Sequence, residues 1–121
     1  MATSAEQQTF AILGAAFSGS PSLVAGIYPD ALPQEVVIPA IVYRRVGTEP
    51  VSVLNAAATG AARVQIMVES WGVTRANAES LANFVNAAMI TAGHIPGERE
   101  GVYDEESRQF AALQHFDVWE T

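Results

Sequence analysis

The stretch RVQIMVESW, residues 63–71, gives the clearest structural signal in the chain. Its residues alternate in character with a period of two, the spacing of side chains that share one face of a β-strand. One face would carry Val64, Ile66, Val68 and Ser70, and the other Arg63, Gln65, Met67, Glu69 and Trp71. A register shift of one residue would bury Arg63 and Glu69, so we expect a strand with Val64, Ile66 and Val68 facing the core.

A helix is predicted directly after this strand. Thr74 suits its N-cap, and Gly93 and Pro96 mark its end. The apolar positions between these signals recur at helical spacing: Ala78, Leu81, Ala82, Val85, Ala88 and Met89. The small alanines among them allow this helix to lie close to a sheet.

The residues before the central strand predict a further strand and a turn. The run AIVYRRV, residues 40–46, is strand-like, and Pro39 stands at the tolerated entry position. Residues 47–50 predict a turn, and residues 51–54 a short returning strand. The alanine-rich piece NAAATGAA, residues 55–62, is too short for a stable helix and is expected to be a flexible loop.

The N-terminal part predicts a helix followed by an extended arm. Ser4 and Gln7 match a capping box, Thr3 and Glu6 offer an alternative frame, and Gly19 ends the helix. One apolar stripe is expected on it: Phe10, Leu13 and Phe17. The arm after it cannot be a central strand because three prolines punctuate it: Pro29, Pro33 and Pro39.

The C-terminal segment REGVYDEESRQFAALQHFDVWE, residues 99–120, predicts a hairpin that turns at residues 104–107. In its last strand one face would hold Phe110, Ala112, Phe116 and Val118, and the other Leu113, His115 and Trp119. Together these elements predict a single α+β domain over residues 1–121. Its sheet would be mainly antiparallel, with about four to five strands and two helices packed on one face.

The second face of that sheet would carry large apolar side chains among polar groups: Met67, Trp71, Leu113 and Trp119. A face of this kind is often a partner surface. The alternative is that these side chains pack against each other or beneath the arm. Seven residues are predicted as the candidate subunit interface: Tyr28, Pro29, Arg63, Met67, Trp71, Leu113 and Trp119.

Composition excludes several functional classes. The 121 residues include no cysteine, so disulfides and thiolate metal sites are not available. A net charge of -7 with no basic patch disfavours a protein that grips nucleic acid. No apolar run approaches the ~18 residues of a membrane span, and the N-terminus has no basic signal region, so folding in a cytoplasm is expected.

No motif for catalysis, a cofactor or a metal is found. Glycine-rich phosphate loops, nucleophile elbows and zinc-protease motifs are missing from the sequence. His94 and His115 show no positioned partner beyond Asp117 on the face of His115. Residues 104–106 predict a solvated turn rather than a calcium loop. Arg44 and Arg45 point to opposite faces of a strand and favour surface ion pairs.

Three segments of the chain, taken in order, carry a resemblance to a known family: IYPDALPQEVVIPAIVYRRVG (27–47), ARVQIMVESWGVTRANAESLANFVNAAM (62–89) and FAALQHFDVWE (110–120). With these segments in this order, the chain resembles the small tail-completion proteins of long-tailed bacteriophages and prophages. In that family a helix precedes an I/V-Y-P and P-x-I-V-Y stretch, an R-V-Q-I strand runs into a helix, and an aromatic F-x-V-W-like strand ends the chain. The resemblance covers nearly the whole chain.

The resemblance implies a structural virion protein of the tail-terminator group. Such subunits form a ring, typically hexameric, at the head-proximal end of the tail tube, where they stop tube growth and join the head connector. The implied partners are other copies of the chain, the tail tube protein and the head connector or stopper protein. DNA would pass through the lumen without specific binding, and the protein would be made in the host bacterial cytoplasm.

Alternatives from other classes stay open at this point. Gene transfer agents and tail-derived secretion machines use similar parts, and a connector or adaptor on the head side is a close rival. A small ligand-binding regulatory domain is a second alternative, because a sheet backed by two helices is a common scaffold. A small hydrolase using His115 and Asp117 is a third.

Overall fold

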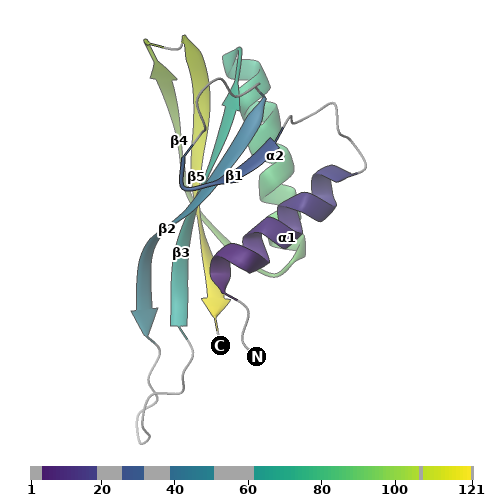
Figure 1. Cartoon of the computed structure of the whole chain (residues 1–121), viewed down its shortest axis with the longest axis vertical. Helices are drawn as coiled ribbons and strands as arrows, with labels where there is room; N and C mark the ends of the chain where they lie inside the picture. The colour runs from purple at the N-terminus through teal and green to yellow at the C-terminus, as the bar shows by residue number, and fades with distance from the viewer. Residues whose placement is uncertain (1–3, 19–25, 32–38, 51–61, 107, 121) are drawn as a thin grey trace, which may run out of the picture.

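The computed structural model describes residues 4–18, 26–31, 39–50, 62–106 and 108–120. These residues form two helices and five strands (Figure 1). In chain order the elements are α1 (Ala5–Ser18), β1 (Gly26–Pro29), β2 (Ala40–Pro50), β3 (Ala62–Gly72), α2 (Arg75–Thr91), β4 (Ile95–Asp104) and β5 (Gln109–Glu120).

The strands form one sheet in the order β1-β2-β3-β5-β4. β1 pairs with β2 in parallel, and the other neighbours pair antiparallel. β3 lies at the centre and pairs with β5 along its whole length, from Ala62 opposite Glu120 to Gly72 opposite Phe110. The predicted α+β class with a mainly antiparallel sheet is therefore confirmed.

Both helices pack against the same face of the sheet, and the core lies between them and the strands (Figure 1). As predicted, Val64, Ile66 and Val68 of β3 are buried there. The other core side chains are Ala5, Leu13, Phe17, Ile41, Tyr43, Leu81, Val85, Met89, Phe116 and Val118. The opposite face, which neither helix covers, is called the open face below.

The first helix begins as predicted but buries a different stripe. The Ser4 hydroxyl accepts from the Gln7 amide at 3.1 Å, and the Gln7 side chain accepts from the Ser4 amide at 3.0 Å, which is a complete capping box. The buried positions are Ala5, Thr9, Leu13 and Phe17. The prediction that Phe10 joins the core stripe was wrong, because its ring is 49% exposed and tilts against Tyr43 at the edge of the core.

The second helix follows the predicted boundaries. The Thr74 hydroxyl accepts from the Asn77 amide at 3.0 Å. At the other end Gly93 takes φ of +94°, its amide donates to Ile90 and the next amide, of His94, donates to Met89. This is the Schellman pattern, in which a glycine lets the chain reverse without a Cβ penalty.

The prediction of a turn at residues 47–50 was wrong. β2 continues to Pro50, with Thr48 opposite Val64 and Glu49 opposite Arg63. A bulge between Arg45 and Gly47 lets the strand absorb an extra residue and keep pairing. The expected returning strand at residues 51–54 and loop residues 55–61 lie outside the described residues, and Ala62 already belongs to β3.

The arm and the final hairpin differ from their predictions in extent. The beginning of the arm forms β1, whose four residues pair with Ala40–Tyr43 at one edge of the sheet. An edge position tolerates Pro29, which has no amide proton to donate. Residues 32–38 of the arm lie outside the described residues. β4 begins at Ile95 rather than near Arg99, and the hairpin turns after Asp104 as expected.

Candidate interface on the open sheet face

The strand register brings nearly all the predicted interface residues onto the open face. In β3 that face holds Arg63, Met67 and Trp71, because the buried core residues alternate with them. In β5 Leu113 pairs with Glu69 and Trp119 with Arg63, so both lie on the same face. Tyr28 pairs with Val42 at the edge of the sheet. Its neighbour Ile27 packs on the core, so Tyr28 faces the open side.

Pro29 is the exception among the predicted interface residues. It pairs with Tyr43, a core residue on the helix side, and its own side chain is exposed at the end of β1. The alternation of side chains therefore places Pro29 on the helix side, at the rim of the sheet, and not on the open face. Its sequence neighbour Tyr28 folds back over Gly26, since a Cβ on Gly26 would lie 2.4 Å from the Tyr28 hydroxyl.

The centre of the open face is already closed to water. Four of its smaller side chains are buried: Ala40, Val42, Met67 and Ala111. Trp71 lies between Ala40 and Ala111 in the register, and it is half-buried. Met67 is 6% exposed, so it can support neighbouring side chains but has little surface to offer a partner.

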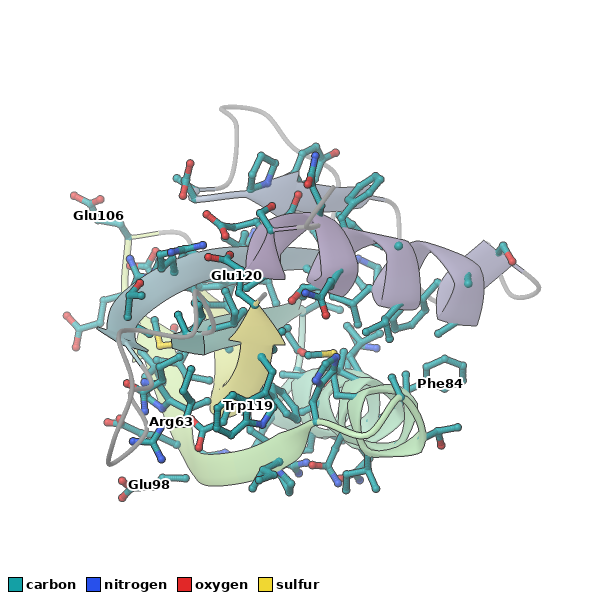
Figure 2. The ribbon with its side chains drawn as sticks, turned by 90° about the horizontal axis from the view of Figure 1, so that it is seen from below. Arg63, Phe84, Glu98, Glu106, Trp119 and Glu120 are labelled. Carbon is teal, nitrogen blue, oxygen red and sulfur yellow. The ribbon has the colours of Figure 1, made fainter. Side chains whose placement is uncertain are left out.

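The exposed part of the open face lies at its margins. Trp119 is 45% exposed near the C-terminal end of β5. Figure 2 shows Trp119 and Arg63 directed away from α1, whereas Glu120 points toward it. On β4, Ile95 is 55% and Val102 37% exposed. Ile95 lies opposite Asp117, close to Trp119, whereas Val102 lies opposite Ala111 at the other end of the face. An exposed tryptophan near an exposed isoleucine is typical of a protein contact surface.

Sequence reasoning missed Ile95 and Val102. The hairpin was expected to begin near Arg99, which left Ile95 in the connection after the helix. The signal that could have found it is the Schellman ending of α2 at Gly93, because the next residues are then free to start a strand. Val102 stands between two charged neighbours on the same face, Glu100 and Asp104, and this alternation was available in the sequence.

Trp71 is fixed by a polar link on the open face. Its indole N–H donates to Glu69 Oε1 at 3.0 Å, and Glu69 Oε2 lies 3.4 Å from Arg44 Nη2. The link joins β2 to β3, since Arg44 is the cross-strand partner of Met67 and Glu69 that of Val42. It confirms the expected surface ion pair for Arg44 and sets the Trp71 ring in one orientation.

Arg45, on the helix side, binds two carboxylates. Its Nη2 lies 2.7 Å from Glu6 Oε1 and 2.6 Å from Glu120 Oε2. The Arg45 hydrogen bond lowers the pKa of Glu6 below its ordinary value, and the bond to Glu6 raises the pKa of Arg45. Glu120 Oε2 also accepts from the Ala5 amide at 2.7 Å, so one cluster connects the start of α1 with the end of β5.

A polar hollow of about 250 Å³ lies at the end of the open face near Trp119. It is lined by Gly47, Thr48, Arg63, Gln65 and Asp117. Asp117 Oδ2 is 4.0 Å from Arg63 Nη1, a long ion pair between two half-exposed side chains. Asp117 and His115 share this face of β5, and the Asp117 carboxylate pairs with Arg63.

A second hollow, of about 510 Å³, lies between the two helices. Its lining residues are Ile12, Ala15, Ala16, Phe84, Ala87, Ala88, Thr91 and Ala92. Only Thr91 among them has a polar side chain. A ligand site normally adds a few convergent polar groups that orient the ligand, and this groove supplies little of that kind.

A protein-family comparison matches the family described as tail completion protein gp17 over residues 11–120. The chain belongs to the tail completion protein gp17 family. No curated protein matches the sequence. The match covers α1 from its second turn, all five strands and α2. This confirms the resemblance found in the sequence.

Membership of the tail completion family makes the chain a bacteriophage tail structural protein and a virion component, which interacts with other tail and head proteins. Within residues 4–120, as far as the structure describes them, no group of three or more potential metal ligands is found. In the same part of the chain, no helix is long and apolar enough to cross a membrane.

Proposed function

We propose that this tail completion protein forms a ring at the head-proximal end of the tail tube, where it ends tube growth and joins the tail to the head connector. The family match over residues 11–120 carries the proposal, because it supplies a place in the tail for a chain with no candidate catalytic motif. The proposed ring is a homo-oligomer of six copies, the number that the resemblance implies.

The open face supports this proposal with a surface suited to assembly. Its centre is rigid, with Trp71 tied to Glu69 and Arg44, while Trp119 and Val102 are exposed at its margins. Rigid apolar side chains lose little conformational entropy on binding. A ring requires heterologous contacts, in which one patch meets a different patch of the next copy. The interface residues predicted above are proposed to take part in these contacts.

The net charge supports a place around passing DNA. At -7, the chain repels a polyanion rather than holding it. DNA is proposed to move through the lumen of the ring without specific binding. The partners proposed along the axis are the tail tube protein on one side and the connector or stopper protein on the other.

Electron microscopy of particles made with this gene disrupted tests the proposal. We expect DNA-filled heads and separate tails, with a share of overlong tails, because uncapped tubes continue to grow. Complementation with the intact gene is the control and restores joined particles. Joined, infectious particles of normal tail length in the disrupted strain would remove the proposed function.

A head-side adaptor is the alternative within the same joint. Incubation of the purified protein with purified tail tubes and, separately, with purified heads distinguishes the two. A tail terminator binds the tube end and leaves heads unchanged. Binding to heads alone would move the protein to the connector side of the joint.

A further inference from the structure

The groove between the two helices is an apolar surface that the described residues leave unfilled. Its volume is about 510 Å³, and its lining combines five alanines with Ile12, Phe84 and Thr91. The Phe84 ring packs on the buried ring of Phe17, with 4.6 Å between their centroids, so one wall of the groove is fixed and aromatic. An apolar hollow open to water is stabilised when apolar side chains of a partner fill it.

Two exposed apolar side chains lie together on the opposite face of the molecule. Trp119 is 45% and Ile95 55% exposed, and Ile95 pairs with Asp117, two residues before Trp119. Diagonal neighbours of this kind lie within reach of an aromatic ring, and we call the two side chains the tryptophan patch. Figure 2 shows Arg63, the cross-strand partner of Trp119, and Phe84 at opposite sides of the molecule. The tryptophan patch and the groove therefore face in opposite directions.

The tryptophan patch and the groove also lie at the same end of the molecule. Ala92 lines the groove at the end of α2, and Ile95 begins β4 three residues later. The Gln8 side chain donates to the Trp119 carbonyl at 3.0 Å, and Ile12 lines the groove about one helical turn after Gln8. In a ring whose axis runs roughly along the strands, neighbouring copies meet at equal levels along that axis. The two surfaces satisfy this condition.

The charges near the two surfaces do not oppose a contact between them. None of the eight described residues that line the groove is charged. Next to Trp119, Arg63 lies 4.0 Å from Asp117, so a cation and an anion balance each other on this part of the open face. Glu120 points toward α1 and is bound there. Glu98, in the bulge of β4, lies toward the outer margin (Figure 2), where protein interfaces are usually polar.

We propose that Trp119 and Ile95 of one copy dock into the groove between α1 and α2 of the next copy in the ring. This inference rests on the proposed ring and specifies the contact that builds it. A patch on the open face meets a groove on the helix side, so the contact is heterologous and can repeat until the ring closes. A second copy is the occupant because the chain itself carries the matching apolar patch. Tryptophan in an apolar pocket is a frequent energetic centre of protein interfaces.

Cysteine cross-linking in assembled particles tests the contact. The chain contains no cysteine, so introduced thiols are the only ones in this protein. The double variant Ile95→Cys with Ala87→Cys places one thiol in the tryptophan patch and one at the exposed rim of the groove, while Trp119 stays in place. It is used to complement the disrupted gene, and the purified particles are treated with a short bis-maleimide. We expect a ladder of covalent multimers that ends at the ring order.

The matched control is Ile95→Cys with Ala76→Cys. Ala76 is exposed on α2, as Ala87 is, but it lies eleven residues earlier, roughly 16 Å along the helix and outside the groove. The two single variants at Ile95 and Ala87 are further controls, because identical thiols meet only where two copies contact each other through the same patch. None of these controls is expected to give multimers.

The outcomes separate the contact from the proposed function. If the double variant is present at the joint and its multimers do not exceed those of the controls, docking into the groove is overturned while the proposed function stands. If the intact chain is absent from particles, the proposed function fails and the contact fails with it.

Filling the groove gives a second readout without a linker. Ala87→Trp places a large ring at the rim of the groove in every copy and is expected to lower the yield of joined particles at least about tenfold. Ala76→Trp makes the same change outside the groove and is expected to leave the yield unchanged. Both positions are exposed, so thermal unfolding of the two purified variants is expected to match the wild type. Equal yields from the two variants would contradict the contact. A loss of joining in Ala87→Trp without the cross-linked ladder would assign the groove to a different protein and would also overturn it.

Discussion

Arg45 binds two carboxylates that come from opposite ends of the chain, Glu6 and Glu120. Exposed ion pairs contribute little, but here one guanidinium serves two partners at once and part of the cluster is shielded. We expect Arg45→Met to lower the free energy of unfolding by about 1 kcal/mol. Arg44→Met, which removes a single longer pair, is the control and is expected to cost less than half of that. Urea denaturation of the purified protein measures both.

The Glu6 carboxylate makes stability depend on pH. Its pKa lies below the ordinary 4.5 because Arg45 donates to it, so its contribution is present above pH 4.5 and is lost as the pH falls through the lowered pKa. We expect the difference in unfolding free energy between the wild type and Glu6→Gln to shrink steadily in that acid range. A difference that stays constant between neutral and acid pH would contradict this assignment.

His94 acts in a different pH window. Burial lowers its pKa from the ordinary 6.5, so the folded protein resists protonation that the unfolded chain accepts. Stability therefore falls as the pH drops below 6.5, and the loss is complete below the lowered pKa. We expect His94→Gln to make stability depend less on pH in this window. Thermal unfolding from about pH 8 to about pH 5, the range in which histidine titrates, measures the change.

Trp119 separates folding from assembly better than Trp71 does. It is 45% exposed, whereas Trp71 is half-buried and hydrogen-bonded to Glu69. We expect Trp119→Ala to change the unfolding free energy by no more than about 0.5 kcal/mol, as for most surface substitutions. The same variant is expected to reduce joined particles in complementation. Unfolding of the isolated Trp119→Ala protein would show that this side chain belongs to the core.

At the scale of elements, Gly72 allows β3 to pass closely into α2. A Cβ added there would lie 2.6 Å from Asn77 Oδ1 and 2.8 Å from the Ala78 amide nitrogen. Because that amide is backbone, it cannot move aside cheaply, and we expect Gly72→Ala to destabilise the fold by about 1–3 kcal/mol. Gly14→Ala is the opposite case. It lies inside α1 with nothing within 4 Å of the added Cβ, and we expect a gain of up to about 1 kcal/mol in chemical denaturation.

Local signals predicted β3 and α2 well because both elements carry their own periodicity and caps. The alternation around Val64, the Thr74 cap and the Gly93 ending depend on residues near one another in sequence. The continuation of β2 through Gly47 could not be predicted this way. A bulge shows itself only through the partner strand, and glycine with proline is otherwise typical of a turn.

The prediction for Phe10 was wrong for a related reason. Its spacing from Leu13 and Phe17 satisfies a helical stripe, yet the helix turns its Ala5–Thr9–Leu13–Phe17 face inward. A polar threonine can be buried there because its hydroxyl donates to the Ala5 carbonyl at 2.8 Å. Sequence spacing alone does not reveal that compensation.

The candidate interface was predictable in part. Alternation within β3 and β5 was enough to predict that four side chains share the open face: Met67, Trp71, Leu113 and Trp119. Alternation could not predict which of them are exposed, because the burial of Met67 depends on strands distant in the sequence. The cluster of Arg45 with Glu6 and Glu120 joins residues 39 and 75 positions apart, and no local pattern indicates such a contact.

For the whole molecule, the pairing of β2 with β3 predicts that the connection between these two strands tolerates change. The pairing of these strands runs to Pro50 and Ala62, so their register does not require a particular connection. We expect deletion of residues 55–60 to leave the fold intact, with an unfolding free energy within about 1 kcal/mol of the wild type, because loop-closure entropy changes slowly with length. Loss of the circular dichroism signal of the folded domain would show that this segment has a structural role.

The ends of the described chain also lie side by side (Figure 1). The Ala5 amide donates to the Glu120 carboxylate at 2.7 Å, and the Gln8 side chain donates to the Trp119 carbonyl at 3.0 Å. The polypeptide thus nearly closes on itself, and a short peptide bridge could join its two termini. A circular permutant opened between β2 and β3 would keep every strand pairing while moving its free ends to the far tip of that hairpin. Fluorescent or affinity tags could then be carried away from the Arg45 cluster.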